Sequence, residues 1–310
     1  MTDDHRPGRP RLGCVIPNGG PLLARESMAT LVAAVEEGGA EGAWFSDHLV
    51  VVEDAASVHP YSPSADEQVD RVRAVATPWY EALACCAFAA AVPSSLGIGT
   101  AVLVLPQRNP IEVAKVAATL DRLSGGRFVL GVGAGWLREE FALLGHDFTS
   151  RAERFEAGIG TIRDCWSGVL TGPGGLRAHT YPVPQGVPIL LGGNHARALR
   201  RAAALGDGWL GIATSWSPYL DELDRQLEVL AGCADRAAGF TRTVRVVQRD
   251  RTDRDELLDI VSALATRPID EIVVEPAWRT PAETVAVLRE VREATDPTAN
   301  VRFAAEGGTT

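Results

Sequence analysis

Short apolar segments alternate with amphipathic segments eight times along the chain, and this alternation constrains the fold most strongly. The apolar segments lack a polar residue at every second position, which indicates strands buried on both faces of a parallel sheet. Strands are expected at 12–16, 43–45, 96–105, 128–130, 188–191, 209–212, 244–247 and 272–274. Helices are expected at 22–37, 79–91, 110–123, 151–166, 195–205, 217–238, 255–265 and 282–293.

Eight such units predict an α/β fold, a (β/α)8 TIM barrel, and single barrels commonly reach the 310 residues of this chain. An open, doubly wound sheet is the alternative, but no G-x-G-x-x-G pattern follows the first strand. We therefore expect one domain over 1–310. Two insertions are expected at the carboxyl ends of the strands: a non-periodic cover over 49–77 and a Gly- and Pro-rich loop over 167–187.

Two helix starts carry capping signals. Asn109 is placed as an N-cap, and Pro110 follows at the first helical position, where its missing N–H costs nothing. Ser150 and Glu153 have the spacing of a capping box, in which each side chain bonds the other residue's backbone N–H. The sequence thus predicts helices that begin at 110 and 151.

Charge and cysteine content narrow the functional classes. The formal net charge is −10 and no basic stripe is present, so a nucleic-acid partner is not expected. Five cysteines without C-x-x-C spacing fit a reducing cytoplasm. No signal peptide begins the chain, and prolines divide its long uncharged stretch, so no membrane segment is expected. His-x-His, H-E-x-x-H, G-x-S-x-G and P-loop motifs are absent, so no metal site is expected.

Three glycines at alternate positions mark the fourth strand. Gly131, Gly133 and Gly135 remove every second side chain directly before Trp136. Glycine weakens a strand, so this pattern indicates close approach of another group. Two readings stay open at this point: a crowded barrel axis, or a flat ligand.

In a barrel, ligands bind where strands end, and the second strand ends at a polar triplet. Asp47 and His48 offer a carboxylate and an imidazole there. Asp47 capping a turn and His48 satisfied in the core are the structural alternative. The long segment that follows favours a functional site.

The fifth strand ends at a glycine corner. Gly192, Gly193 and Asn194 stand immediately before a helix, whose free amide groups and positive end suit a phosphate. A tight turn between strand and helix would use the same residues.

After the fourth strand, Trp136 with Glu139 and Glu140 could flank a heterocycle, although acidic residues also favour a helix start. Small residues at Thr100 and Ala101 indicate a bulge or a close backbone approach in the third strand.

These segments together resemble the bacterial luciferase-like monooxygenase superfamily, and within it the oxidoreductases that use the deazaflavin coenzyme F420. The resemblance covers the chain from the first strand to about Trp209. It rests on SDH at 46–48, NP at 109–110, ATLD at 118–121, LSGGR at 123–127, LGVGAGWLREE at 130–140, LGG at 191–193 and ALGDGW at 204–209.

The resemblance implies a ring system lying across the carboxyl ends of the strands. A non-proline cis peptide behind the ring would fall at Ala101-Val102. Cofactor contacts would come from Asp47, Thr100, Ala101, Val102, Gly135, Trp136, Gly192, Gly193 and Asn194, with the phosphate at Gly193 and Asn194. Relatives with a glutamate directly after the last glycine of the fourth strand use it as a proton donor. This chain has Trp136 there, which leaves His48, Glu139 or the substrate itself as the donor, with Asp47 beside the ring.

The main hypothesis is an F420-dependent oxidoreductase that transfers hydride between the deazaflavin and a small-molecule organic substrate beneath 49–77. Deazaflavin reacts poorly with oxygen, so reduction of an imine, an enone or a similar acceptor is favoured over oxygenation. The alternatives are a monooxygenase that uses reduced FMN and oxygen, and a barrel that binds a ligand without turnover. We expect a cytoplasmic homodimer.

Overall fold

The computed structural model describes residues 9–53, 55–59, 79–215, 219–233, 239–248 and 251–296. Most of the predicted cover over 49–77 therefore lies outside the described residues. The remaining ranges include every strand that the sequence pattern predicts.

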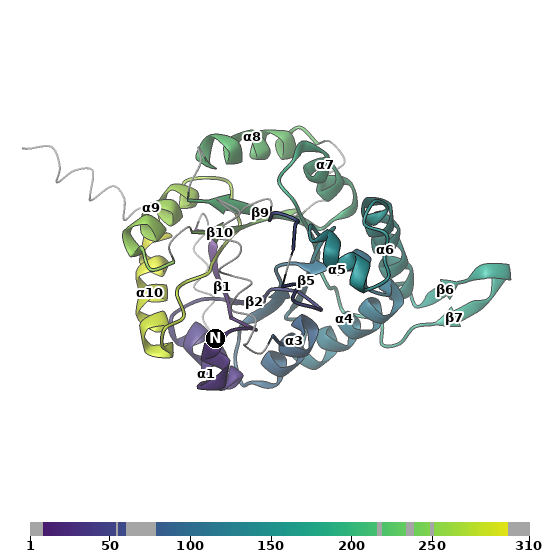
Figure 1. Ribbon diagram of the computed structural model, residues 1–310, viewed down its shortest axis with the longest axis horizontal. Coiled ribbons are helices and arrows are strands. Elements are labelled where there is room, and N and C mark those ends of the chain that lie inside the picture. Colours follow the sequence, from purple (N-terminus) through teal and green to yellow (C-terminus); the bar gives the residue numbers. More distant parts are fainter. Residues whose placement is uncertain are drawn as a thin grey trace, which may run out of the picture.

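The strands form one closed, parallel sheet in the order β3-β2-β1-β11-β10-β9-β8-β5-β4, with β3 also pairing β5 (Figure 1). Because β3 and β4 are two pieces of one barrel strand and both pair with β5, the nine strands make an eight-stranded barrel in the described chain. The predicted TIM-barrel fold is confirmed, and the open sheet is excluded. The strands are β1 (Arg11–Val15), β2 (Gly42–Phe45), β3 (Gly97–Thr100), β4 (Leu103–Val104), β5 (Phe128–Gly133), β8 (Ile189–Gly192), β9 (Gly208–Thr214), β10 (Thr241–Val247) and β11 (Glu271–Val274).

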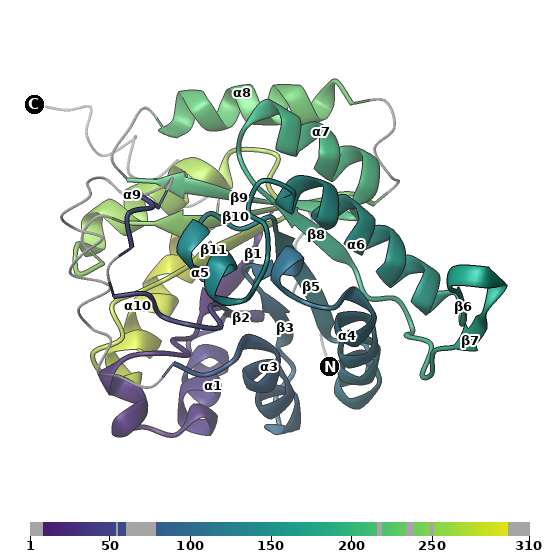
Figure 2. The same cartoon turned by 45° about the vertical axis from the view of Figure 1, so that its right-hand side comes forward.

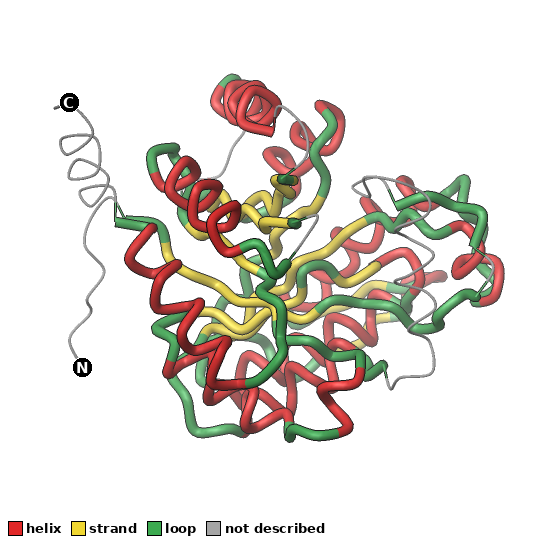
Figure 3. The backbone as a smooth tube through the Cα atoms, turned by 60° about the vertical axis from the view of Figure 1, so that its left-hand side comes forward, coloured by secondary structure: helices red, strands yellow, loops and turns green. Residues whose placement is uncertain are grey.

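Helices surround the barrel and cover the outer faces of its strands (Figures 1 and 3). No helix in the described parts of the chain combines the length and apolar composition that crossing a bilayer requires. The helices are α1 (Met28–Glu37), α3 (Ala82–Ala91), α4 (Pro110–Ser124), α5 (Arg138–Leu143), α6 (Arg151–Trp166), α7 (Ala196–Leu205), α8 (Tyr219–Ala231), α9 (Arg254–Ala265) and α10 (Pro281–Ala294), with short 3-10 turns at η1 (Pro21–Ala24), η3 (Leu105–Gln107) and η4 (Pro173–Gly175).

One of the two capping predictions is correct. Asn109 caps α4 through a hydrogen bond from the Ile111 N–H, and α4 begins at Pro110 as expected. The capping box predicted for α6 is wrong, because the Ser150 side chain makes no cap bond and donates to the Asp147 carbonyl instead. The helix still begins at Arg151.

One expected helix is interrupted, and one expected loop contains strands. The helix expected over 22–37 is η1 followed by α1, since Ser27 accepts a hydrogen bond from the Thr30 N–H and starts a new helix. Within 167–187, β6 (Val169–Thr171) and β7 (Arg177–His179) pair as an antiparallel hairpin, which projects from the barrel beside α6 (Figure 2). The glycine-rich turn between the two strands makes this pairing possible.

The glycines of β5 make room for the protein itself. A Cβ on Gly131 would clash with the carbonyl oxygen of Thr100, and one on Gly133 would lie 2.6 Å from Cγ2 of Val102. Val102 packs against the apolar interior cluster, which includes Val15, Ala101 and Leu210. The crowded barrel axis is therefore the reading that the structure supports at these two positions.

Replacing Gly131 by alanine is expected to lower the free energy of unfolding by about 2 kcal/mol, because the added methyl group meets a backbone oxygen in a filled core. Gly160→Ala is the control: Gly160 is exposed in α6, with open space where its Cβ would lie. That substitution should raise stability by up to about 1 kcal/mol. Urea unfolding of both variants measures the difference, and equal effects would contradict the packing argument.

Candidate active site at the barrel mouth

His48 and Glu140 form a hydrogen-bonded pair at the carboxyl ends of the strands. His48 follows β2, Glu140 lies in α5 after β5, and Nδ1 of His48 is 3.1 Å from Oε2 of Glu140. The imidazole is 26% exposed, whereas the carboxylate is 1% exposed. Nε2 of His48 makes no hydrogen bond to any part of the chain that the structure describes. The pair thus leaves one imidazole nitrogen available at the mouth.

The buried Glu140 carboxylate also accepts backbone hydrogen bonds from the segment after β2. Its Oε1 lies 2.7 Å from the N–H of Leu49 and 3.2 Å from that of Val50. Burial raises the pKa of Glu140, but hydrogen bonding and charge from His48 together with the Val50 N–H outweigh it, so the pKa is lowered from its usual value. Glu140 is therefore an ionised group that orients His48 and anchors its loop.

The sequence analysis singled out Glu139 as catalytic, whereas the structure pairs His48 with Glu140. Oε1 of Glu139 instead accepts hydrogen bonds from the N–H groups of Ala56 and Ser57, at 2.9 and 3.0 Å. The sequence contained only a weak signal for Glu140: the buried Leu137 lies three residues before it, at the start of the helix, and residues at that spacing are neighbours on a helix. Phe141, the next residue, does not share that face.

Aromatic rings enclose the imidazole. The ring of Trp79 meets His48 edge to face at 5.7 Å between centroids, and Trp136 does so at 6.2 Å. Trp136, predicted to contact the cofactor, also packs against His59 at 4.9 Å. Gly19 packs against the face of Trp79 so closely that a Cβ there would clash. These contacts give His48 two apolar walls.

Asn18 joins three of the segments that form the mouth, and the sequence analysis missed it. Its amide nitrogen donates to the carbonyl of Ser46 at 2.7 Å and to that of Tyr80 at 2.8 Å. The backbone carbonyl of Asn18 accepts a hydrogen bond from the Tyr80 N–H. The side chain is 2% exposed, so it fixes the exits of β1 and β2 relative to the start of α3.

Asp47 is held in a buried ion pair. Its Oδ1 lies 2.6 Å from Nη2 of Arg108, and its Oδ2 accepts from the Val104 N–H at 2.9 Å. Arg108 also pairs with Glu81 at 2.9 Å. Burial raises the pKa of Asp47, while Arg108 and the Val104 N–H oppose that effect. Asp47 thus ties β2 to β4, and its predicted roles in catalysis and cofactor contact stay predictions.

The third barrel strand is interrupted where the sequence analysis expects a bulge. The peptide bond between Ala101 and Val102 is cis, which confirms the expectation for this position. The carbonyl oxygen of Ala101 accepts a hydrogen bond from Nη1 of Arg245 in β10, at 2.6 Å. Thr100 is fully buried and donates to the Gly131 carbonyl, so its side chain faces β5.

The glycine corner after β8 has the features of an anion site. Gly193 has φ of +125°, which favours glycine, and a Cβ there would lie 2.8 Å from that of Ala198. The N–H groups of 194–197 make no hydrogen bond within the described chain. They stand at the positive end of α7, where a phosphate fits. The Asn194 side chain is already engaged with both backbone groups of Ile212, at 2.5 and 3.0 Å, which leaves its backbone N–H for a ligand.

The two other glycines predicted to contact the cofactor are constrained by packing. A Cβ on Gly135, which has φ of +80°, would lie 2.7 Å from side-chain atoms of both Val104 and Phe141. One on Gly192 would lie 3.2 Å from Val102. The positive φ and the packing together account for glycine at Gly135, and the close contact with Val102 favours glycine at Gly192.

Sequence comparison identifies one family and several mycobacterial relatives. A family model described as luciferase-like monooxygenase matches residues 14–304. An uncharacterized protein of Mycobacterium tuberculosis is 33% identical over 205 residues, which are 63% of this chain and 67% of that protein. The phthiodiolone/phenolphthiodiolone dimycocerosates ketoreductase of the same species is 29% identical over 258 residues, which are 77% of this chain and 65% of the ketoreductase.

Solved structures share the fold at low sequence identity. An F420-dependent secondary alcohol dehydrogenase in complex with an F420-acetone adduct has a TM-score of 0.67 at 15% identity, over 93% of this chain and 99% of that one. The oxygenating constituent of 3,6-diketocamphane monooxygenase from Pseudomonas putida, in complex with FMN, has a TM-score of 0.64 at 15% identity, over 93% and 98%. Both kinds of cofactor therefore occur among proteins of this fold.

Proposed function

Because this chain belongs to the luciferase-like monooxygenase family, we propose that it is an F420-dependent oxidoreductase that transfers hydride between the deazaflavin and a small organic substrate. Members of this family are oxidoreductases or monooxygenases, so the proposal concerns the cofactor and the type of reaction. It includes a small-molecule substrate held at the barrel mouth.

The observation that carries the proposal is the His48–Glu140 pair. Reduction of a carbonyl or similar polarised double bond requires a proton at the heteroatom as well as a hydride at carbon. The bound deazaflavin would supply the hydride. Nδ1 of His48 is directed at a buried carboxylate, and Nε2 makes no hydrogen bond in the part of the chain that the structure describes, which is the arrangement of a general acid or base. Trp79 and Trp136 place aromatic rings against two sides of the imidazole.

The residues present fit a phosphorylated cofactor. The backbone N–H groups at Gly193 and Asn194 would hold the phosphate at the start of α7. Ala101, Val102, Gly135 and Trp136 lie at the mouth beside the interrupted strand, where the ring would rest. The names of a ketoreductase among the relatives and of an F420-dependent alcohol dehydrogenase among the structures agree with this assignment.

An FMN-dependent monooxygenase is the second candidate. The same glycine corner suits the phosphate of FMN, and the diketocamphane monooxygenase with the same fold holds that cofactor. Reduction requires an acid that gives a proton to the heteroatom of the substrate, and oxygenation does not require an acid in that role. The orientation of His48 therefore favours the reductase.

Cofactor binding distinguishes the two candidates. The purified protein is incubated separately with F420 and with FMN, dialysed, and examined by its absorbance spectrum. We expect retention of F420 and oxidation of reduced F420 when a ketone or enone is added. Retention of FMN with no affinity for F420 would overturn the proposal in favour of the monooxygenase.

A further inference from the structure

A cavity of about 270 Å³ opens at the carboxyl ends of β10, β11 and β1. Its size is just below that of typical drug-sized ligand sites, about 300–1,000 Å³, which indicates a compact ligand. Its walls are polar and apolar in about equal parts, and the apolar part includes Pro17, Pro21, Leu22 and Trp278. The indole N–H of Trp278 donates to the Val15 carbonyl at 2.9 Å, so this ring has a fixed position.

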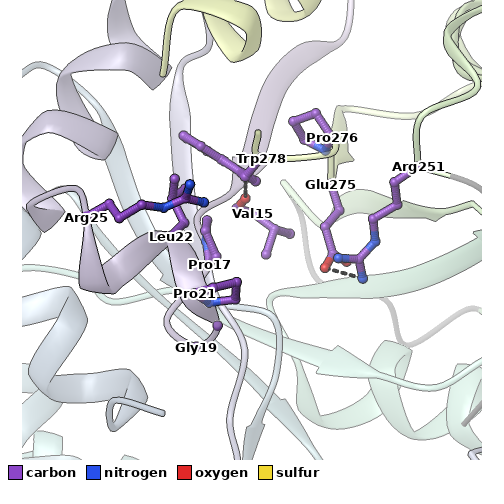
Figure 4. Close-up of a pocket in the computed structure, with 11 residues that line it drawn as sticks. Val15, Pro17, Gly19, Pro21, Leu22, Arg25, Arg251, Glu275, Pro276 and Trp278 are labelled. Atoms are coloured by element: carbon purple, nitrogen blue, oxygen red, sulfur yellow. Dashed lines mark hydrogen bonds and ion pairs between the residues drawn. The ribbon is translucent and has the colours of Figure 1, made fainter. Parts of the chain in front are cut away.

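Two guanidinium groups reach this cavity from opposite sides (Figure 4). Arg25, at the end of η1, makes no side-chain hydrogen bond or ion pair within the described part of the chain. Arg251 is 2.5 Å from Oε1 of Glu275, whose Oε2 is 2.5 Å from Arg245. Among the described residues that line the cavity, Arg25 and Arg251 are basic and Glu275 is acidic. Two positive charges and one negative charge leave a net formal charge of +1 in this lining, in a protein with a net charge of −10.

We propose that this cavity binds the carboxylate of the substrate, which is a small organic acid with an apolar body. That the bound acid is the substrate rests on the proposed function. Carboxylate binding itself requires no cofactor. Arginine recognises carboxylates through paired, charge-assisted hydrogen bonds, and the apolar part of the walls accommodates the remainder of such a ligand.

The position of the cavity separates it from the phosphate site and connects it to His48. In the order of strands around the barrel, β8 is two steps from β10, three from β11 and four from β1, so the cavity and the Gly193 corner lie at different strand ends. Gly19 lines the cavity and packs on Trp79, which contacts the His48 ring. Val15, another lining residue, belongs to the same cluster as Ala101. An acid bound here would extend towards the centre of the mouth.

A matched pair of probes tests the charge requirement. Fluorine NMR titration of the purified protein compares para-fluorobenzoate with para-fluorobenzamide, its neutral analogue. We expect the benzoate to bind at least about tenfold more tightly, in keeping with a charge-assisted contact. Arg25→Gln and Arg251→Gln should each weaken benzoate binding about tenfold and leave the benzamide unchanged. Arg225→Gln, on the exposed face of α8, is the control and should alter neither.

Equal binding of the two probes, binding of neither, or benzoate affinity that both substitutions leave unchanged would overturn the inference. A second measurement concerns turnover: with the cofactor that the protein retains, a keto or enoic acid should be reduced faster than its methyl ester, and Arg25→Gln should abolish this preference. Tight benzoate binding without F420 affinity would remove the proposed function and keep the carboxylate site. F420-dependent reduction with no preference for acids would keep the proposed function and remove the carboxylate site.

Discussion

Replacing His48 by alanine is expected to lower kcat for F420-linked reduction by about 10²- to 10⁴-fold, the usual contribution of a positioned general acid. The physical reason is that Nδ1 of His48 is held 3.1 Å from a buried carboxylate, while Nε2 makes no hydrogen bond within the described residues. Cofactor affinity should change by less than about threefold, because the proposed phosphate site lies on α7 and does not involve the imidazole. Stopped-flow absorbance measures the hydride-transfer rate, and fluorescence titration measures the affinity.

His179→Ala is the matched control. His179 lies on the projecting hairpin, where its Nδ1 contacts the Gly168 carbonyl at 3.1 Å and its ring stacks on Tyr181. The same chemical change there should leave kcat and cofactor affinity unaltered. Full activity of His48→Ala would exclude the imidazole as proton donor. Parallel loss of F420 affinity in that variant would assign His48 to binding.

Much of the fold could be predicted because burial leaves a periodic record in the sequence. Most helices with one apolar face and strands with two were placed within a few residues: the last helix was expected at 282–293 and spans Pro281–Ala294. An exception is the helix expected at 217–238, because α8 spans Tyr219–Ala231 and residues 232–233 are not helical. The wrong predictions of helix starts arose where a serine side chain could form either of two local hydrogen bonds. Ser27 and Ser150 are both plausible N-caps, and only the surrounding backbone decides that the first one caps a helix and the second bonds to Asp147.

The candidate site was less predictable because its contacts join residues far apart in the chain. His48 and Glu140 are 92 positions apart, and Arg245 and Ala101 are 144 apart. No spacing in the sequence encodes such pairs, which depend on closure of the barrel. Position alone did predict that strand ends would gather at one face, but not which of two adjacent glutamates would turn inward.

Two substitutions at Glu140 are expected to separate its anchoring role from its orienting role. Glu140→Ala leaves the N–H groups of Leu49 and Val50 without their acceptor and should lower the free energy of unfolding by about 3 kcal/mol, with loss of activity. Glu140→Gln can keep both backbone bonds through its amide oxygen and should lose only about 1 kcal/mol. Its amide nitrogen would then face Nδ1 of His48 and favour the other tautomer, which should lower kcat roughly tenfold or more. The exposed Glu112→Gln is the control for loss of a negative charge.

The pH dependence of stability tests whether the Glu140 carboxylate is ionised in the folded protein. The pKa of Glu140 in the folded chain is lowered from an ordinary value of 4.5, so the folded state binds fewer protons at this group than the unfolded state does. The stability it contributes is therefore complete above about pH 4.5 and is lost as the pH falls through the lowered folded pKa. Urea unfolding of the wild type and Glu140→Gln should show a free-energy difference that is constant above that pH and shrinks on acidification. A difference that grows in acid would mean that burial dominates over the bonds from His48 and the backbone, and that Glu140 enters the fold protonated.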